Sequence, residues 1–245
     1  MIDDGQIANL IAALDHPDKP TIRAAVDALI ALASASTDLQ KLLHQRLTED
    51  GHKNYWPVAY ILGHLRNPSD ECIGKLIDTL DHREPDIRWA IALLLVRLAK
   101  DQGTVVNLLL ELCASGTANQ KRMALYCIRD LALSDSTSLV ALLKALNDAD
   151  PTVRVAAAIC LKMRPDLDEA GKNTLLQVYL RDIDPKVRNA VVIALAALGS
   201  PSVEFLSALN EARESENGQT KKAAGAALQL LEKRRSASTG SLRDR

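Results

Sequence analysis

The stretch that decides the fold is residues 146–156, which read Leu-Asn-Asp-Ala-Asp-Pro-Thr-Val-Arg-Val-Ala. An acidic turn is followed here by a proline, a β-branched residue and Arg-x-Ala. The same order recurs in residues 14–25 (Leu-Asp-His-Pro-Asp-Lys-Pro-Thr-Ile-Arg-Ala-Ala), 80–90 (Leu-Asp-His-Arg-Glu-Pro-Asp-Ile-Arg-Trp-Ala) and 180–190 (Leu-Arg-Asp-Ile-Asp-Pro-Lys-Val-Arg-Asn-Ala). Self-similarity of this kind is the signature of a repeat protein.

Three weaker copies, at residues 55–59, 120–124 and 220–224, fill the gaps between the clear ones. One anchor residue can be chosen in each copy: Arg23, Pro57, Arg88, Arg122, Arg154, Arg188 and Lys222. Successive anchors are 34, 31, 34, 32, 34 and 34 residues apart. A near-constant step over seven copies predicts a tandem array.

Each copy carries the local signals of a helix pair. An apolar segment such as 139–146 precedes the turn and another, such as 187–198, follows it, both with the spacing of a one-sided helix. A proline begins the second helix, and its missing N–H loses no hydrogen bond there because the first N–H groups of a helix have no acceptor within it. The acidic residue before the proline can accept a backbone N–H as the N-cap. These residues are Pro20, Pro85, Pro151 and Pro185, with Asp18, Glu84, Asp150 and Asp184 ahead of them. The predicted pairs cover residues 4–33, 37–66, 69–99, 102–133, 135–164, 166–199 and 201–234.

This pattern resembles the HEAT-repeat family, in particular the short bacterial HEAT units of phycobilisome-lyase-like proteins, over residues 3–234. The resemblance implies an all-α fold, a right-handed α-solenoid of about seven antiparallel helix pairs. We therefore expect a single domain over residues 1–234. Residues 235–245 hold too few apolar side chains to pack, so we expect a disordered basic tail there.

Composition narrows the class of function. The net charge of -1 provides no basic field for nucleic acid or an anionic membrane, and aromatics at 3% do not suit a β-sandwich. No apolar stretch is long enough to span a membrane, and the acidic start of the chain is not a signal peptide. The four cysteines form no Cys-x-x-Cys pair and lie in apolar helical runs, which indicates core packing in a reduced, cytoplasmic setting.

Motifs for catalysis, cofactors or metals are missing from the sequence. There is no His-Glu-x-x-His, no P-loop and no Gly-x-Ser-x-Gly. Deoxyhypusine hydroxylase, a HEAT-fold enzyme, binds iron through His-Glu dipeptides, and this chain has none. His16 and His82 are interpreted as polar turn residues. One arginine recurs at the same position of five copies, and we interpret this arginine column as structural: it holds neighbouring repeats together by pairing with acidic turn residues. The column is Arg23, Arg88, Arg122, Arg154 and Arg188, and the acids include Asp148, Asp150, Asp182 and Asp184.

The second helices hold the candidate binding surface. In HEAT solenoids these helices line the concave face, and here they carry aromatic and charged residues of the kinds that anchor partners. The candidates are Tyr55, Trp56, Tyr60, His64, Trp89, Arg97, Tyr126, Arg129, Asp130 and Lys162.

The leading hypothesis is a non-catalytic scaffold whose concave face binds another protein, with no cofactor. The alternative implied by the resemblance is a bilin (phycobilin) lyase-like subunit or a chaperone for phycobiliproteins. A more remote alternative is a HEAT-like DNA glycosylase, whose aromatic and acidic cluster Trp89, Tyr126 and Asp130 could imitate. The neutral net charge argues against that activity, because DNA binding depends on neutralising phosphates. The partner and the oligomeric state stay open.

Overall fold

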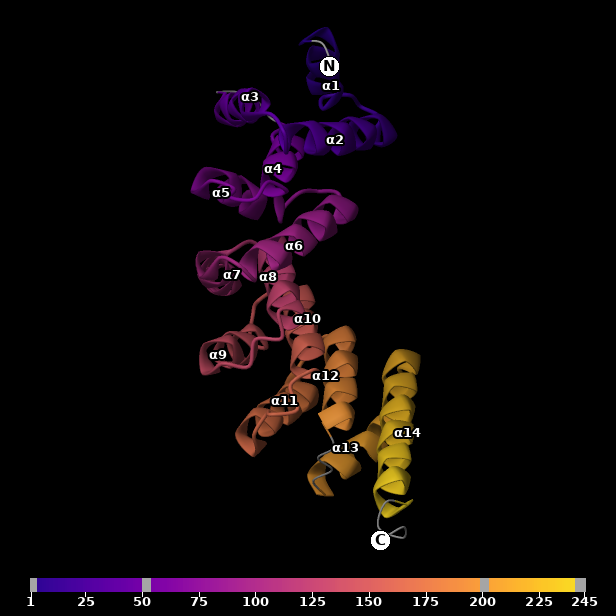
Figure 1. The fold of residues 1–245 in the computed structure, drawn as a ribbon. Helices are drawn as coiled ribbons and strands as arrows, with labels where there is room; N and C mark the ends of the chain where they lie inside the picture. Colours follow the sequence, from indigo (N-terminus) through magenta and orange to yellow (C-terminus); the bar gives the residue numbers. More distant parts are fainter. Residues whose placement is uncertain (1–3, 50–53, 199–202, 241–245) are drawn as a thin grey trace. The chain divides into compact units, whose positions relative to one another are not determined.

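The computed structural model describes residues 4–49, 54–198 and 203–240, which form fourteen α-helices and no strand (Figure 1). The all-helical fold predicted from the sequence is confirmed. The chain divides into two compact units, Met1–Val106 and Asn107–Arg245, and the division falls inside one helix. Both units are built from helix pairs with the same packing. The single domain over residues 1–234 stays a prediction.

The first unit stacks three helix pairs. Its second helices pack in series, α2 on α4 and α4 on α6, while each first helix packs on its own pair mate. Figure 1 shows α3 and α5 together on one side of this stack. The helices are α1 (Asp4–Ala13), α2 (Lys19–Ala33), α3 (Thr37–Thr48), α4 (Trp56–Gly63), α5 (Asp70–Thr79) and α6 (Pro85–Ala99), followed by the start of α7 (Gly103–Ser115).

The second unit repeats the arrangement, with α8 on α10, α10 on α12 and α12 on α14. Contacts between successive second helices define an α-solenoid in each unit. The helices are α8 (Ala118–Asp130), α9 (Ser136–Ala145), α10 (Pro151–Leu161), α11 (Glu169–Arg181), α12 (Pro185–Leu198), α13 (Val203–Arg213) and α14 (Gly218–Gly240). Because α14 continues to Gly240, helix covers part of the predicted tail, and residues 241–245 lie outside the described residues.

The turn chemistry explains where the second helices begin. Asp18 caps α2 by accepting the N–H of Thr21 (3.1 Å), and Asp150 caps α10 by accepting that of Thr152 (2.7 Å). Such a cap contributes about 1 kcal/mol. Glu84 makes no cap bond, and its carboxylate instead accepts from Lys19, 2.8 Å away in the first repeat.

Two members of the predicted arginine column, Arg88 and Arg154, bind turns. Arg154 donates to both oxygens of Asp182 in the next repeat (2.7 and 2.9 Å) and to the carbonyl of Asp148 in its own turn (2.8 Å). Arg88 likewise donates to the carbonyls of its own turn. Other members depart from the pattern: Arg122 bonds Asn119 on its own helix, and its neighbour Lys121 makes the ion pair to the next repeat, with Asp148 (2.8 Å).

The core is built of leucine, isoleucine, valine and alanine, and it includes all four cysteines. Cys72 donates to the carbonyl of Ala59 (3.4 Å), and Cys160 to that of Leu125 (3.3 Å), which ties each to the preceding repeat. Burial raises the pKa of each of the four thiols to about 12. The prediction that the cysteines are packing residues is confirmed. Among the described residues, no helix is long and apolar enough to cross a membrane.

Candidate functional site

The candidate residues divide between the two units. Six lie in the first unit and four in the second, so each group is a local surface of its own unit. The first group is Tyr55, Trp56, Tyr60, His64, Trp89 and Arg97, and the second is Tyr126, Arg129, Asp130 and Lys162.

The first group contains a compact cluster around Tyr60. The rings of Tyr60, in α4, and of His64, the residue that caps the C-terminus of α4, have centroids 4.4 Å apart. Nδ1 of His64 donates to the carbonyl of Tyr60 (2.9 Å). Arg97 reaches over from α6 and donates to the carbonyl of Gly63 (2.7 Å). A cation at the C-terminus of α4 complements the helix dipole. With Arg23 and Asp27 of α2, whose charges act on the Tyr60 phenol, these residues form the Tyr60 cluster.

Burial sets the protonation states in the Tyr60 cluster. It raises the pKa of the Tyr60 phenol, to which Asp27 adds and which Arg97 and Arg23 oppose. Burial also lowers the pKa of His64, against the hydrogen bond to Tyr60. At neutral pH the cluster therefore presents a protonated phenol and a neutral imidazole between charged side chains. It offers hydrogen bonds and an aromatic surface, with no nucleophile among its members.

An exposed stripe continues from the cluster along α6. Trp89, Leu93 and Arg97 follow one another at four-residue spacing, which places them on one face of the helix. Trp89 is 40% exposed and Leu93 is 62% exposed. Leu93 was missed by the sequence analysis, although its spacing from Trp89 and Arg97 within the run Leu93–Leu95 could have placed it on this face.

The ring contacts of Tyr55 and Trp56 are with residues outside the Tyr60 cluster. The ammonium of Lys75, on α5, lies 4.9 Å from the ring centroid of Tyr55. Trp56 meets the imidazole of His82 edge to face, with centroids 6.2 Å apart. Both side chains therefore contact the next repeat. Trp56 directly precedes the anchor Pro57, as Lys121 precedes Arg122, so the Trp56–His82 contact occupies the place of the Lys121–Asp148 ion pair.

The second group is held together by charge. The guanidinium of Arg129 lies 5.0 Å from the ring centroid of Tyr126, and its Nε donates to Asp130 (2.7 Å). That hydrogen bond raises the pKa of Arg129. Lys162 is exposed at the end of α10, next to Met163, a 61% exposed side chain that the sequence analysis did not select. The contacts join Tyr126, Arg129 and Asp130, and they leave Lys162 outside that trio.

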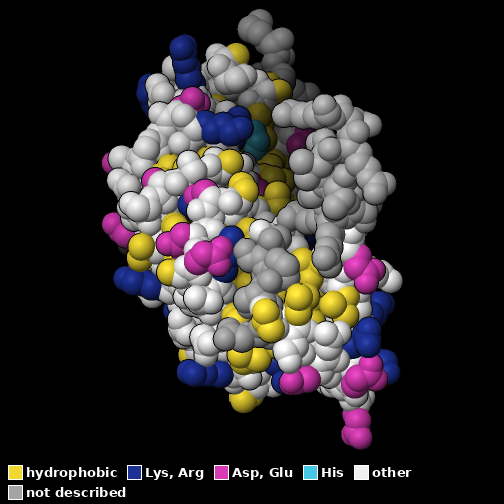
Figure 2. All heavy atoms as spheres, turned by 90° about the horizontal axis from the view of Figure 1, so that it is seen from below, with side chains coloured by type: hydrophobic (Ala, Val, Ile, Leu, Met, Phe, Trp, Pro, Cys, Tyr) yellow, Lys and Arg dark blue, Asp and Glu magenta, His cyan; other side chains and the backbone are white. Residues whose placement is uncertain are grey.

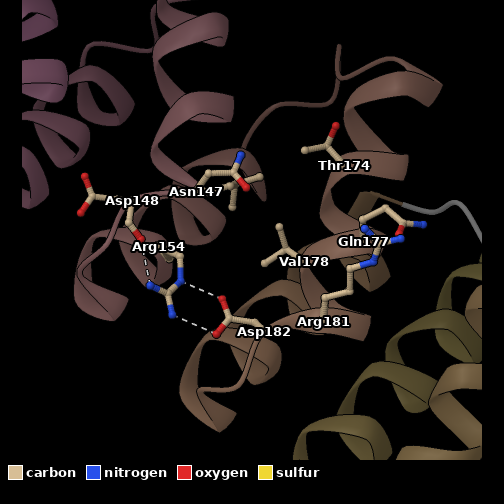
Figure 3. Close-up of a pocket in the computed structure, with 9 residues that line it drawn as sticks. Asn147, Asp148, Arg154, Thr174, Gln177, Val178, Arg181 and Asp182 are labelled. Atoms are coloured by element: carbon tan, nitrogen blue, oxygen red, sulfur yellow. Dashed lines mark hydrogen bonds and ion pairs between the residues drawn. The ribbon is translucent and has the colours of Figure 1, made fainter.

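A pocket of about 360 Å³ lies on a different part of the second unit, between the end of α9 and helix α11. Figure 3 shows Arg154 and Asp182 facing one another on one side of the pocket, and Thr174, Gln177, Val178 and Arg181 projecting from α11. The two opposite charges are bound to each other. No sequence motif predicts this pocket, because its lining residues come from the turn after α9, from α10 and from α11, and they meet only in the folded chain.

The possible metal ligands and the surface charge drawn in Figure 2 mark no further site among the described residues. No group of three or more His, Cys, Asp or Glu side chains within the described ranges could hold a metal ion. On the face drawn in Figure 2, basic and acidic side chains are interspersed. Neither feature adds a catalytic constellation to the surfaces described above.

A family model described as HEAT repeats matches residues 139–229. Over these residues, which are less than half of the chain, the sequence is similar to HEAT repeats. The resemblance seen in the sequence is confirmed, and the matched segment covers most of the helix pairs from α9 to α14. The helix pairs of the first unit have the same α-solenoid packing as the matched pairs. No curated protein sequence matches the chain.

Solved structures of repeat proteins resemble the fold. The E. coli protein YibA has a TM-score of 0.52 at 16% identity, with 94% of this chain and 93% of that chain covered. Human deoxyhypusine hydroxylase in complex with glycerol has a TM-score of 0.38 at 16% identity, covering 93% and 96%. A designed armadillo repeat protein in complex with the peptide (KR)4 has a TM-score of 0.38 at 17% identity, covering 92% and 99%. At these identities the likeness to YibA shows the solenoid fold alone.

Proposed function

We propose that the chain is a non-catalytic protein-binding protein, and that the Tyr60 cluster together with Trp89 and Leu93 holds a segment of its partner. The observation that carries the proposal is the α6 stripe, where Trp89 is 40% exposed and Leu93 is 62% exposed on the same helix face as Arg97. Aromatic and arginine side chains are enriched among the residues that dominate binding energy.

The neighbouring polar groups suit a protein segment. Tyr60 and His64 offer hydrogen-bonding groups to a backbone, while Arg23, Asp27 and Arg97 supply charges around Tyr60. An apolar centre with a polar rim is the usual anatomy of a protein interface. The trio Tyr126, Arg129 and Asp130 would provide a separate contact on the second unit.

Single substitutions on the exposed stripe test the proposal without disturbing the core. The partner is first captured from the native cell on immobilised wild-type protein and identified by mass spectrometry. Its affinity is then measured for Trp89→Ala and Leu93→Ser. We expect Trp89→Ala to weaken binding by about 30-fold, since a central anchor contributes about 2 kcal/mol or more.

Leu42→Ser is the matched control, because Leu42 is a 45% exposed leucine of the same unit that lies on the first helix α3. This variant should bind the partner as the wild type does. Undiminished binding by both stripe variants, or an equal loss in Leu42→Ser, would show that the partner does not use the α6 stripe.

A further inference from the structure

The turn before each second helix contains one repeated hydrogen bond. In five repeats, the side chain at one position accepts the backbone N–H of the residue two places further on. His16 accepts from Asp18 (3.1 Å) and His82 from Glu84 (3.1 Å). Asp148 accepts from Asp150 and Asp182 from Asp184, both at 2.9 Å, and Ser215 accepts from Asn217 (3.2 Å). The first unit therefore uses imidazoles where the second unit uses two carboxylates and a hydroxyl.

Imidazole and carboxylate acceptors respond differently to acid. A carboxylate keeps accepting until its own proton is bound, near pH 4 or below, whereas an imidazole nitrogen accepts only while it is unprotonated. Protonated imidazole is a donor at both nitrogens, so with His82 protonated the N–H group of Glu84 would face another N–H. That turn would lose its bond and gain a repulsion between donors.

We propose that the His82 turn is a pH-sensitive device that loosens the contact between repeats two and three as this imidazole is protonated, while the Asp148 and Asp182 turns of the second unit stay closed. His82 lies in the turn that leads into α6. It also touches Trp56, so this turn is part of the contact between repeats two and three.

The surroundings of His82 oppose its protonation. Burial lowers the pKa of the half-buried imidazole, Arg83 and Arg88 lower it further, and Glu84 and Asp86 act in the opposite direction. The two carboxylates are already engaged by Lys19 of α2 (2.8 and 3.1 Å), and the uncharged Trp56 packs from α4. A histidine whose pKa is lowered in the folded state contributes stability above its unfolded pKa and loses it as the pH falls below that value.

His64 has the opposite hydrogen bond and serves as the internal control. Its Nδ1 donates to the carbonyl of Tyr60, and a protonated imidazole still donates. Protonation of His64 therefore keeps its local bond, although burial lowers its pKa as well.

Hydrogen exchange of the full chain, followed by mass spectrometry at pH 7.5 and pH 5.5 and corrected for the intrinsic rate, tests the device. We expect protection of the residue 82–84 turn to fall by up to about tenfold at pH 5.5, one pH unit below the ordinary histidine pKa of about 6.5. Protection of the 148–150 and 182–184 turns should stay unchanged. An equal loss at all three turns, or no loss at residues 82–84, would overturn the proposal.

The variant His82→Asn replaces the imidazole with an amide oxygen that accepts at any pH. It should keep the native exchange pattern at pH 7.5 and abolish the loss at pH 5.5. His64→Asn should retain the loss. If the loss persists in His82→Asn and vanishes in His64→Asn, then His64 is the sensor and the turn device is wrong.

Discussion

Arg154 shows how a single side chain joins two repeats. Its guanidinium binds the Asp182 carboxylate through two nitrogens, and only 14% and 7% of the two side chains are exposed. Burial alone would raise the pKa of Asp182, but the hydrogen bonds from Arg154 and from the N–H of Asp184 outweigh it and lower the pKa. Asp182 therefore contributes stability above about pH 4, and this is lost as the pH falls through its lowered value.

Arg154→Ala should lower the free energy of unfolding by about 2–3 kcal/mol, because it leaves a buried carboxylate without its partner. Urea unfolding at pH 7 measures the change. Lys19→Ala is the control: Lys19 also joins two repeats, through Glu84 and Asp86, but its side chain is 51% exposed, so the variant should unfold close to the wild type. Equal losses in the two variants would show that burial does not distinguish these pairs.

The turn between α7 and α8 requires a residue without a side chain, Gly116. A Cβ at Gly116 would lie 2.8 Å from the backbone oxygen of Leu112, which accepts the Gly116 N–H. A backbone atom cannot move aside as a side-chain end can. After this glycine, Thr117 and Gln120 form a reciprocal capping box that starts α8.

Gly116→Ala should therefore destabilise the protein by about 1–3 kcal/mol, the range for overpacking. Gly74→Ala offers a matched comparison, since Gly74 lies within α5 and a Cβ there would meet no atom within 4 Å. That variant should stabilise the protein by about 0.5–1 kcal/mol, because alanine loses less entropy in a helix. Thermal unfolding followed by circular dichroism measures both, and stabilisation by Gly116→Ala would contradict the proposed clash.

On the scale of the whole molecule, the two compact units carry their own buried thiols. Cys72 belongs to the first unit, while Cys113, Cys127 and Cys160 belong to the second. Each thiol has its pKa raised to about 12 by burial, so almost none is present as the reactive thiolate at pH 8.

Iodoacetamide at pH 8 should therefore modify none of these cysteines in the native chain, as read by intact mass. In increasing urea, a condition that opens only the first unit should add a single label, and the label should map to Cys72. Modification of any of the four in the absence of urea, at the rate of a free thiol, would contradict the packing described here.

The sequence by itself determined the fold class, the helix pairs and the stacking role of Arg154. These follow from local signals: the apolar period selects helices, proline and its preceding acid start them, and a constant step places each acidic turn beside the next. The weaker copies were found by the step alone, and the structure confirms their helices α4, α8 and α14.

Only the tertiary structure decided which side chains meet. It directs Tyr55 and Trp56 to the next repeat, gathers Tyr60, His64 and Arg97, leaves Leu93 exposed and opens a pocket beside α11. The reason is physical: exposure of a helical residue depends on how close the neighbouring repeat packs, and that distance is set by side chains about thirty residues away in the sequence. The partners of the histidines also depend on the fold. Both imidazoles lie near helix ends, but His64 donates to a carbonyl and His82 accepts from a backbone N–H.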